Sequence, residues 1–315
     1  MNIEFRSTGL RCWHAGDGAL VVTLEGERPT ISAAVLDAYH RAIALAESRF
    51  EMLVIGEGQK DFAYGADLGD TVTAAASGDT TPLDRLLDYY QQTMLALRHA
   101  RIPTIAVSRG VAVSGGCEVL MHCTRVVAAP MSPIGLAEAS IGVMPAGGGV
   151  KEMARLAATR AGGGSLLPDL ERAFGVVSGA RIAYARDAKN FDLLTEHDVV
   201  TDEADLLSIA KNVGRELLQN GHRPPPRDLR IRVGGSDAYE HLIALQAADQ
   251  GITPHQRRVN ADIARVLCGG DGATPEVPEQ ALLDLERRYF LRLVQTPLTQ
   301  ARFVHLRNTG TALRN

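Results

Sequence analysis

Two glycine-centred segments decide how this chain is interpreted: Phe62-Ala63-Tyr64-Gly65-Ala66-Asp67-Leu68 and Ser114-Gly115-Gly116-Cys117-Glu118. Each segment follows or ends a β-rich stretch and opens onto a helix-like one. Its backbone amides should therefore point out of a strand-to-helix turn, where an anionic oxygen is held best. Together the two segments can aim two backbone N–H groups at one developing oxyanion. This pattern is typical of an enzyme that acts on acyl groups.

Outside these segments, short apolar runs alternate with amphipathic stretches. Nearly continuous apolar runs predict buried strands, and apolar residues at helical spacing predict helices between them. The predicted strands are 19–24, 52–55, 103–107 and 125–129. The predicted helices are 33–46, with Ser32 as N-cap, 81–101, 118–123 and 150–159. The alternation indicates repeated ββα-like units in a layered α/β domain.

Beyond a flexible break at 161–165, the sequence becomes mostly helical. A proline-rich connector lies at 222–226. The helices predicted in this part are 168–184, 204–219, 237–249, 254–267 and 277–295. We therefore divide the chain into a core over residues 1–165 and a helical C-terminal region over residues 166–315.

Composition narrows the function classes. The 33 basic and 37 acidic residues give a net charge of −4, and neither sign forms a long block, so nothing favours nucleic acid or an anionic membrane as a partner. The four cysteines lack the spacings of a zinc site or a disulfide framework. No run of about 18 apolar residues occurs, and the N-terminus has no apolar signal region. We expect a cytoplasmic protein without a bound metal.

Three linked segments carry a family resemblance: FAYGADL (62–68), IPTIAVSRGVAVSGGCEVLMHC (102–123) and PIGLAEASIGVMPAGGG (133–149). In order, spacing and residue type they resemble the crotonase (enoyl-CoA hydratase/isomerase) superfamily. The tail, with HRPPP (222–226) and EQALLDLERRYFLRL (279–293), is similar to the C-terminal hydratase half of two-domain 3-hydroxyacyl-CoA dehydrogenases. The resemblance implies a spiral of ββα repeats, C-terminal helices that cover the acyl pocket, and a homo-oligomer, either a trimer or a dimer of trimers.

The resemblance also assigns the chemistry. Hydration of a 2-enoyl thioester needs an oxyanion hole, a base for the water and an acid for C2. The resemblance implies that the N–H groups of Ala66 and Gly115 form the oxyanion hole. Glu118, on the first turn of the next helix, is the candidate base. Glu138 is the candidate acid. Two carboxyl groups in one pocket would push their pKa values apart, so that one is protonated and the other ionised.

Further residues are assigned to substrate binding. Tyr64, Gly65 and Gly116 belong to the two glycine-centred segments, and Pro145, Ala146 and Gly147 match a loop that lines the pocket floor. Ala146 departs from the family, in which glycine usually follows the proline. A position that needs a positive φ would tolerate alanine poorly. Arg28-Pro29 resembles a short basic segment near the adenine of coenzyme A.

These assignments predict an enoyl-CoA hydratase, a lyase of the hydro-lyase type, in fatty acid oxidation. The substrate is an acyl-CoA thioester, so coenzyme A is part of the substrate and no cofactor is permanently bound. No GxGxxG follows a strand, and we therefore expect no NAD. Two alternatives stay open: an isomerase that works through one glutamate, and a non-catalytic subunit whose tail binds a separate dehydrogenase or thiolase chain.

Overall fold

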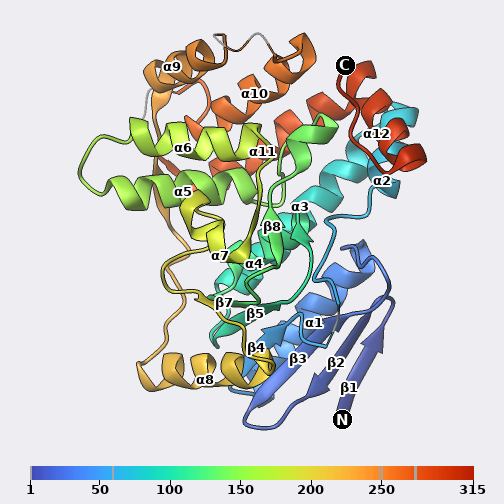
Figure 1. Ribbon diagram of the computed structural model, residues 1–315, viewed down its shortest axis with the longest axis vertical. Helices are drawn as coiled ribbons and strands as arrows, with labels where there is room; N and C mark the ends of the chain where they lie inside the picture. The colour runs from blue at the N-terminus through green and yellow to red at the C-terminus, as the bar shows by residue number, and fades with distance from the viewer. Residues whose placement is uncertain (1, 59, 248, 250, 273–274) are drawn as a thin grey trace. The chain divides into compact units, whose positions relative to one another are not determined.

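The computed structural model describes residues 2–58, 60–247, 249, 251–272 and 275–315 (Figure 1). The chain forms two compact units, each made of separate stretches of sequence. The first comprises Met1–Asp67, Tyr89–Gly135 and Ile182–Arg227, and the second Leu68–Asp88, Leu136–Arg181 and Asp228–Asn315. The bounds of these units differ from the predicted division of the chain into residues 1–165 and 166–315. The pocket-covering and oligomerising roles predicted for residues 166–315 stay predictions.

A mixed sheet forms the centre of the first unit (Figure 1). Its strand order is β1 (Asn2–Ser7), β2 (Leu10–His14), β3 (Ala19–Leu24), β4 (Met52–Ile55), β5 (Thr104–Ser108), β7 (Arg125–Ala128) and β10 (Val199–Val200). The strands β1, β2 and β3 pair antiparallel, and those from β3 to β10 pair parallel. Every residue of β3, β4 and β5 is buried, as their apolar runs predict for strands covered on both faces.

Helices cover both faces of this sheet. On one face, Val21, Val54 and Ile105 pack against Leu206 of α8 (Leu206–Gln219). Helix α1 (Ala33–Arg49) contacts β3 and β4 but is absent from that cluster, so it covers the opposite face. The predicted N-cap of α1 is confirmed, because Ser32 Oγ accepts a hydrogen bond from the Val35 N–H.

A smaller sheet in the first unit carries one of the glycine-centred segments. It consists of β6 (Ala112–Val113), β8 (Pro133–Gly135) and β9 (Ile182–Tyr184), and α4 (Gly115–His122) begins directly after β6. The turns that follow β9 are α7 (Ala185–Ala188) and η2 (Lys189–Phe191). The prediction of a helix over 168–184 was wrong at its end: α6 (Leu167–Ser178) stops at Ser178, and 182–184 pairs with β8.

The second unit is mainly helical. Its long helices α5 (Gly149–Ala161), α6, α10 (Pro254–Leu267) and α11 (Glu279–Val294) contact one another. The remaining elements are α2 (Gly69–Ser77), η1 (Glu138–Ile141), β11 (Arg230–Arg232), α9 (Gly235–Ala247), β12 (Glu276–Pro278) and α12 (Pro297–Thr309). Helix α3 (Thr81–Arg98) contributes its first residues here and the rest to the first unit. Residue 248, within the predicted helix 237–249, lies outside the described residues.

The α/β class and the helical C-terminal region are confirmed. The sequence analysis did not identify β1, β2 or α12. Across the described ranges, no helix combines the length and the apolar character that crossing a membrane requires.

Candidate active site

The two glycine-centred segments meet in the first unit. A Cβ atom built on Gly115 would lie 3.2 Å from Ala66 N, and one built on Gly65 would lie 3.4 Å from Gly115 N. The segments are also joined through Ala63, whose carbonyl accepts a hydrogen bond of 3.0 Å from the Val113 N–H. The structure therefore brings the backbone nitrogens of Ala66 and Gly115 close together.

The local hydrogen bonds orient both N–H groups. Ala66 forms a parallel bridge with Ile31 that uses the Gly65 carbonyl and the Asp67 N–H, so the Ala66 N–H points away from Ile31. Gly115 is the first residue of α4, and its N–H has no acceptor within the helix. The positive end of the helix dipole also lies here. This arrangement can hold an anionic oxygen.

The backbone at these turns restricts the side chains that fit. Gly65 has φ of +107°, in the left-handed region that glycine adopts most easily. A Cβ atom on Gly115 would lie 2.2 Å from Tyr90 Oη, far inside van der Waals contact. Ser114, the N-cap of α4, has φ of 54° and ψ of −124°, so backbone strain is stored next to the Gly115 N–H. Gly116 follows and is buried.

Tyr64 lies beside the segment 28–29 that resembles a coenzyme A contact. Its N–H donates to the Pro29 carbonyl over 2.9 Å, and the Arg28 guanidinium lies 4.6 Å from the centre of its ring. The Tyr64 hydroxyl donates to Asp61 Oδ2 over 2.9 Å. Burial and the Asp61 carboxylate raise the pKa of Tyr64. Arg28 itself is exposed, which leaves its charge accessible to a ligand.

Glu118 lies on the first turn of α4 and is 3% exposed. The helix dipole stabilises a carboxylate at this position. His122 lies one turn further on, and its Nδ1 is 2.7 Å from the Glu118 carbonyl oxygen. Because a carbonyl can only accept, Nδ1 carries the proton. His122 and Cys117 are both buried.

The other predicted residues belong to the second unit. Glu138 is the first residue of η1 and is 9% exposed. Pro145, Ala146 and Gly147 are buried in the loop before α5. In this loop the positive φ, +111°, occurs at Gly148 and not at Ala146, so alanine causes no backbone strain where the family usually has glycine.

Three polar residues that the sequence analysis missed hold the turn that carries Glu138. Thr299 Oγ1 donates to the Gly142 carbonyl over 2.8 Å and lies 2.9 Å from His255 Nε2. Arg302 Nη1 donates to the Ala139 carbonyl over 3.3 Å. Burial, assisted by the charges of nearby arginines, lowers the pKa of His255 to about 4. Helices α10 and α12 therefore fix the position of η1.

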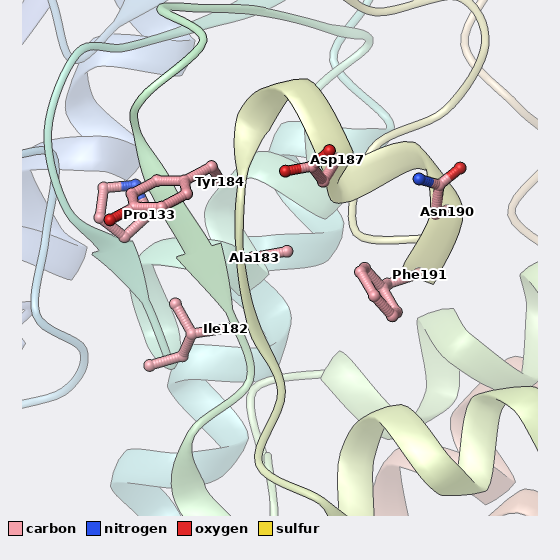
Figure 2. A pocket seen from close by; sticks show the side chains of 7 residues that line it. All are labelled: Pro133, Ile182, Ala183, Tyr184, Asp187, Asn190 and Phe191. Atoms are coloured by element: carbon pink, nitrogen blue, oxygen red, sulfur yellow. The ribbon is translucent and has the colours of Figure 1, made fainter.

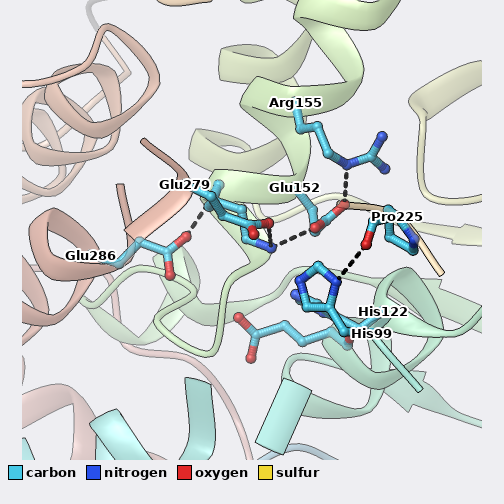
Figure 3. Close-up of polar contacts among 9 residues, drawn as sticks. His99, His122, Glu152, Arg155, Pro225, Glu279 and Glu286 are labelled. Atoms are coloured by element: carbon cyan, nitrogen blue, oxygen red, sulfur yellow. Dashed lines mark hydrogen bonds and ion pairs between the residues drawn. The ribbon is translucent and has the colours of Figure 1, made fainter. Parts of the chain in front are cut away.

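A buried ion-pair network anchors the start of α5 (Figure 3). Lys151, which is 0% exposed, contacts Glu152 Oε1 at 2.5 Å and Glu279 Oε1 at 3.0 Å. Arg155 Nε contacts Glu152 Oε2 at 2.7 Å, and the Lys151 N–H donates to Glu286 Oε1 over 2.6 Å. The network ties α5 to α11 directly after the loop that contains Pro145, Ala146 and Gly147.

A cavity of about 570 Å³ in the first unit contains none of the predicted site residues (Figure 2). It opens beside β9 and the turns that follow. It is lined by Pro133, Ile182, Ala183, Tyr184, Asp187, Asn190 and Phe191. Ile182 and Tyr184 are large exposed hydrophobic residues on its wall. We assign no catalytic role to this cavity.

The predicted site thus falls into two groups. Tyr64, Gly65, Ala66, Gly115, Gly116 and Glu118 lie in the first unit, and Glu138, Pro145, Ala146 and Gly147 lie in the second. Within each unit the residues lie on neighbouring turns. The convergence of the two groups on one substrate stays a prediction.

Comparison with known proteins extends this description. A family model described as enoyl-CoA hydratase/isomerase matches residues 16–166. A probable 3-hydroxyacyl-CoA dehydrogenase of Bacillus subtilis (strain 168) is 28% identical over 98% of this chain and 40% of its own length. A putative fatty acid oxidation complex trifunctional enzyme of Rickettsia felis is 37% identical over 36% of this chain and 16% of its own length. The chain thus spans two fifths or less of these two relatives.

Solved structures share the fold. The enoyl-CoA hydratase of Rhodobacter sphaeroides 2.4.1 superimposes with a TM-score of 0.67 at 18% identity, over 98% of this chain and 92% of that one. An enoyl-CoA hydratase of Mycobacterium avium subsp. paratuberculosis K-10 superimposes with a TM-score of 0.62 at 19% identity, over 98% of both chains. These similarities confirm the predicted fold.

Proposed function

We infer that the chain is a member of the enoyl-CoA hydratase/isomerase family of the crotonase superfamily, whose family model matches residues 16–166, and we propose that it adds water to a trans-2-enoyl-CoA to give a 3-hydroxyacyl-CoA. The observation that carries the proposal is the close approach of Ala66 N and Gly115 N, with Glu118 on the same helix as Gly115. Two amides and a neighbouring carboxylate supply an oxyanion hole and a base.

In the proposed mechanism, the thioester oxygen accepts hydrogen bonds from the N–H groups of Ala66 and Gly115. Glu118 takes a proton from a water molecule as the water oxygen bonds to C3. The electron pair of the C2–C3 double bond moves toward the thioester oxygen, which gains enolate character. Glu138 then donates a proton to C2. Proton exchange with solvent returns both carboxyl groups to their starting states.

Substrate binding is proposed to use the remaining predicted residues. We propose that Arg28, exposed beside Tyr64, lies near the adenine of coenzyme A when the substrate binds. Pro145, Ala146 and Gly147 are proposed to line the floor of the acyl pocket. Hydration transfers no electrons between the substrate and a carrier, so the reaction requires no NAD.

The names of the relatives suggest the metabolic setting. We propose that the substrates come from fatty acid oxidation in the cytoplasm and that a dehydrogenase oxidises the product. A trimer or a dimer of trimers is proposed from the family resemblance. These proposals concern only the residues of this chain, because the chain matches only part of the length of its dehydrogenase and trifunctional relatives.

An isomerase is the second candidate, and one observation favours it. The first unit alone contains both amides and one buried carboxylate, Glu118, and moving a double bond needs only these groups. The base would remove a proton from C2 of a 3-enoyl-CoA and return it at C4.

The test is to incubate the purified chain separately with crotonyl-CoA, a long-chain trans-2-enoyl-CoA and a 3-enoyl-CoA, and to identify the products by mass. Loss of the conjugated-enoyl absorbance with a mass gain of one water supports the hydratase. Conversion of the 3-enoyl-CoA without hydration of either 2-enoyl-CoA selects the isomerase. No turnover from a well-folded protein would overturn both and favour the non-catalytic subunit.

A further inference from the structure

A second cavity, of about 300 Å³, lies within the second unit. Its walls come from η1, the end of α6, the start of α10 and the residues after α12. Ser140, Ser178 and Thr253 contribute hydroxyl groups, whereas Ile252 and Leu313 contribute apolar surface. Its size is at the lower end of the range for small-molecule pockets, about 300–1,000 Å³. None of the residues predicted for the acyl-CoA site lines it.

Arg302 places a buried positive charge on this wall. The residue is 2% exposed. Its Nε donates to Asn315 Oδ1 over 2.8 Å, and its Nη1 donates to Gln256 Oε1 over 2.8 Å and to the Ala139 carbonyl. All three acceptors are neutral, and Nη2 has no hydrogen-bond acceptor among the described residues. A buried guanidinium without a counter-charge is costly, and an anion in the cavity would offset that cost.

Arg314 adds a second positive charge to the same cavity. It is exposed, and its Nη2 donates to the Gly251 carbonyl over 2.9 Å. Burial and the nearby charge of Arg314 both lower the pKa of Arg302. No acidic side chain is among the described residues that line the cavity. The start of α10, with Thr253 as its N-cap, adds the positive end of a helix dipole.

We propose that this cavity binds a small organic anion, with a carboxylate or phosphate group between Arg302 and Arg314 and a short apolar body against Ile252 and Leu313. The planar guanidinium groups suit the oxygens of either anionic group. The Thr253 hydroxyl accepts from the Gln256 N–H and can donate to the anion, whereas the hydroxyls of Ser140 and Ser178 already donate to backbone carbonyls. The site is separate from the residues assigned to the acyl-CoA.

The site adjoins the turn that carries Glu138. Ala139 and Ser140 line the cavity and directly follow Glu138 in η1. A bound anion should therefore slow amide exchange in residues 138–143. This readout depends on binding and not on catalysis, so it stays informative if the proposed hydratase function fails.

The test is isothermal titration of the full chain with hexanoate, with n-butyl phosphate and with the neutral hexanamide, together with hydrogen exchange of residues 138–143. Hexanoate or n-butyl phosphate should bind and hexanamide should not, and the tighter anion identifies the preferred group. Arg314→Gln should weaken binding about tenfold, the loss of one charge-assisted hydrogen bond. Arg307→Gln is the matched control, because Arg307 is exposed on α12 but does not line the cavity.

Arg302→Gln should abolish binding, and circular dichroism checks that this variant is folded. If Arg302→Gln does not fold, Arg314→Gln alone tests the site. Equal binding of hexanamide and hexanoate would overturn the proposal. Binding that Arg314→Gln leaves unchanged would also overturn it, because that binding belongs to another part of the protein. The proposal is also overturned if neither anion produces heat on titration or slows amide exchange in residues 138–143.

Discussion

The first unit positions its two oxyanion-hole groups through the backbone, whereas the second unit holds the turn of Glu138 with buried polar side chains. Ala66 and Gly115 contribute N–H groups whose positions follow from tight turns. Glu138 instead lies on a turn that Thr299 and Arg302 hold, and the neighbouring loop precedes the buried Lys151 network. The first arrangement leaves no room for a Cβ atom on Gly65 or Gly115, and the second depends on buried hydrogen bonds and ion pairs. The two units should therefore fail in different ways when mutated.

The largest effect is expected from Lys151→Met in the second unit. Removing this ammonium leaves Glu152 and Glu279 buried without their shared counter-charge, which should destabilise the protein by about 3–5 kcal/mol. Urea unfolding followed by circular dichroism measures the change. Adding Glu279→Gln should recover part of the loss. Lys189→Met, at a looser ion pair with the exposed Glu196, is the control and should cost under about 1 kcal/mol. Equal stability of the two single variants would contradict the comparison.

Gly115→Ala should act on the first unit through geometry. The new Cβ atom would lie 2.2 Å from Tyr90 Oη and 3.2 Å from Ala66 N, so the two amides must separate. We expect kcat/KM for crotonyl-CoA to fall about a hundredfold or more, the usual cost of losing one oxyanion donor. Tyr90→Phe added to this variant should restore part of the rate. Gly163→Ala is the control, since a Cβ atom there meets nothing within 4 Å. Full activity of Gly115→Ala would remove the basis for the oxyanion hole.

A pH-dependent effect is expected from His255 in the second unit. Its pKa is lowered from 6.5 to about 4 in the folded protein. As the pH falls, the unfolded chain binds the proton first, so the stabilisation present above pH 6.5 is lost between that pH and about 4. Unfolding free energies measured across this window should fall less steeply for His255→Gln than for the wild type. Parallel curves would show that another group controls the response.

The smallest effect is expected from Thr299→Val. The variant keeps the shape of the side chain but removes the hydrogen bond to the Gly142 carbonyl and the contact with His255 Nε2, at a cost of about 1–2 kcal/mol. Amide exchange in residues 138–143 should become faster. Thr309→Val, which removes an exposed hydrogen bond to the His305 carbonyl, should leave that segment unchanged. Unaltered exchange in Thr299→Val would mean that α12 does not fix the Glu138 turn.

The contrast between the units also explains which parts of the site were predictable. At Gly65 and Gly115 the backbone leaves no room for a side chain, so only glycine fits. Such glycines form a pattern that is visible in the sequence. The buried strands β3 and β4 were equally visible, because both faces are covered and every residue is apolar or nearly so. The pairing of Lys151 with Glu279 joins residues far apart in sequence, and no local pattern reveals it.

The helix and strands that the sequence analysis missed or misassigned also lack a local sequence pattern. The buried residues of α12 are Thr299, Arg302 and Phe303, so its buried face lacks the apolar periodicity that indicates a helix. Strand β9 has three residues and exists through its pairing with β8, which local sequence does not specify. Of the six residues of β1 only Phe5 is buried, so the strand shows no alternation that a sequence pattern would reveal.

The most direct test of the central claim measures hydration of crotonyl-CoA by the wild type, Glu118→Gln, Glu138→Gln and the double variant. If one carboxyl group from each unit acts in the same step, each single variant should lose nearly all activity and the double variant should lose little more. The fold of each protein is checked by circular dichroism. Hydration that survives in folded Glu138→Gln would contradict a site shared between the two units and would assign the chemistry to the first unit alone.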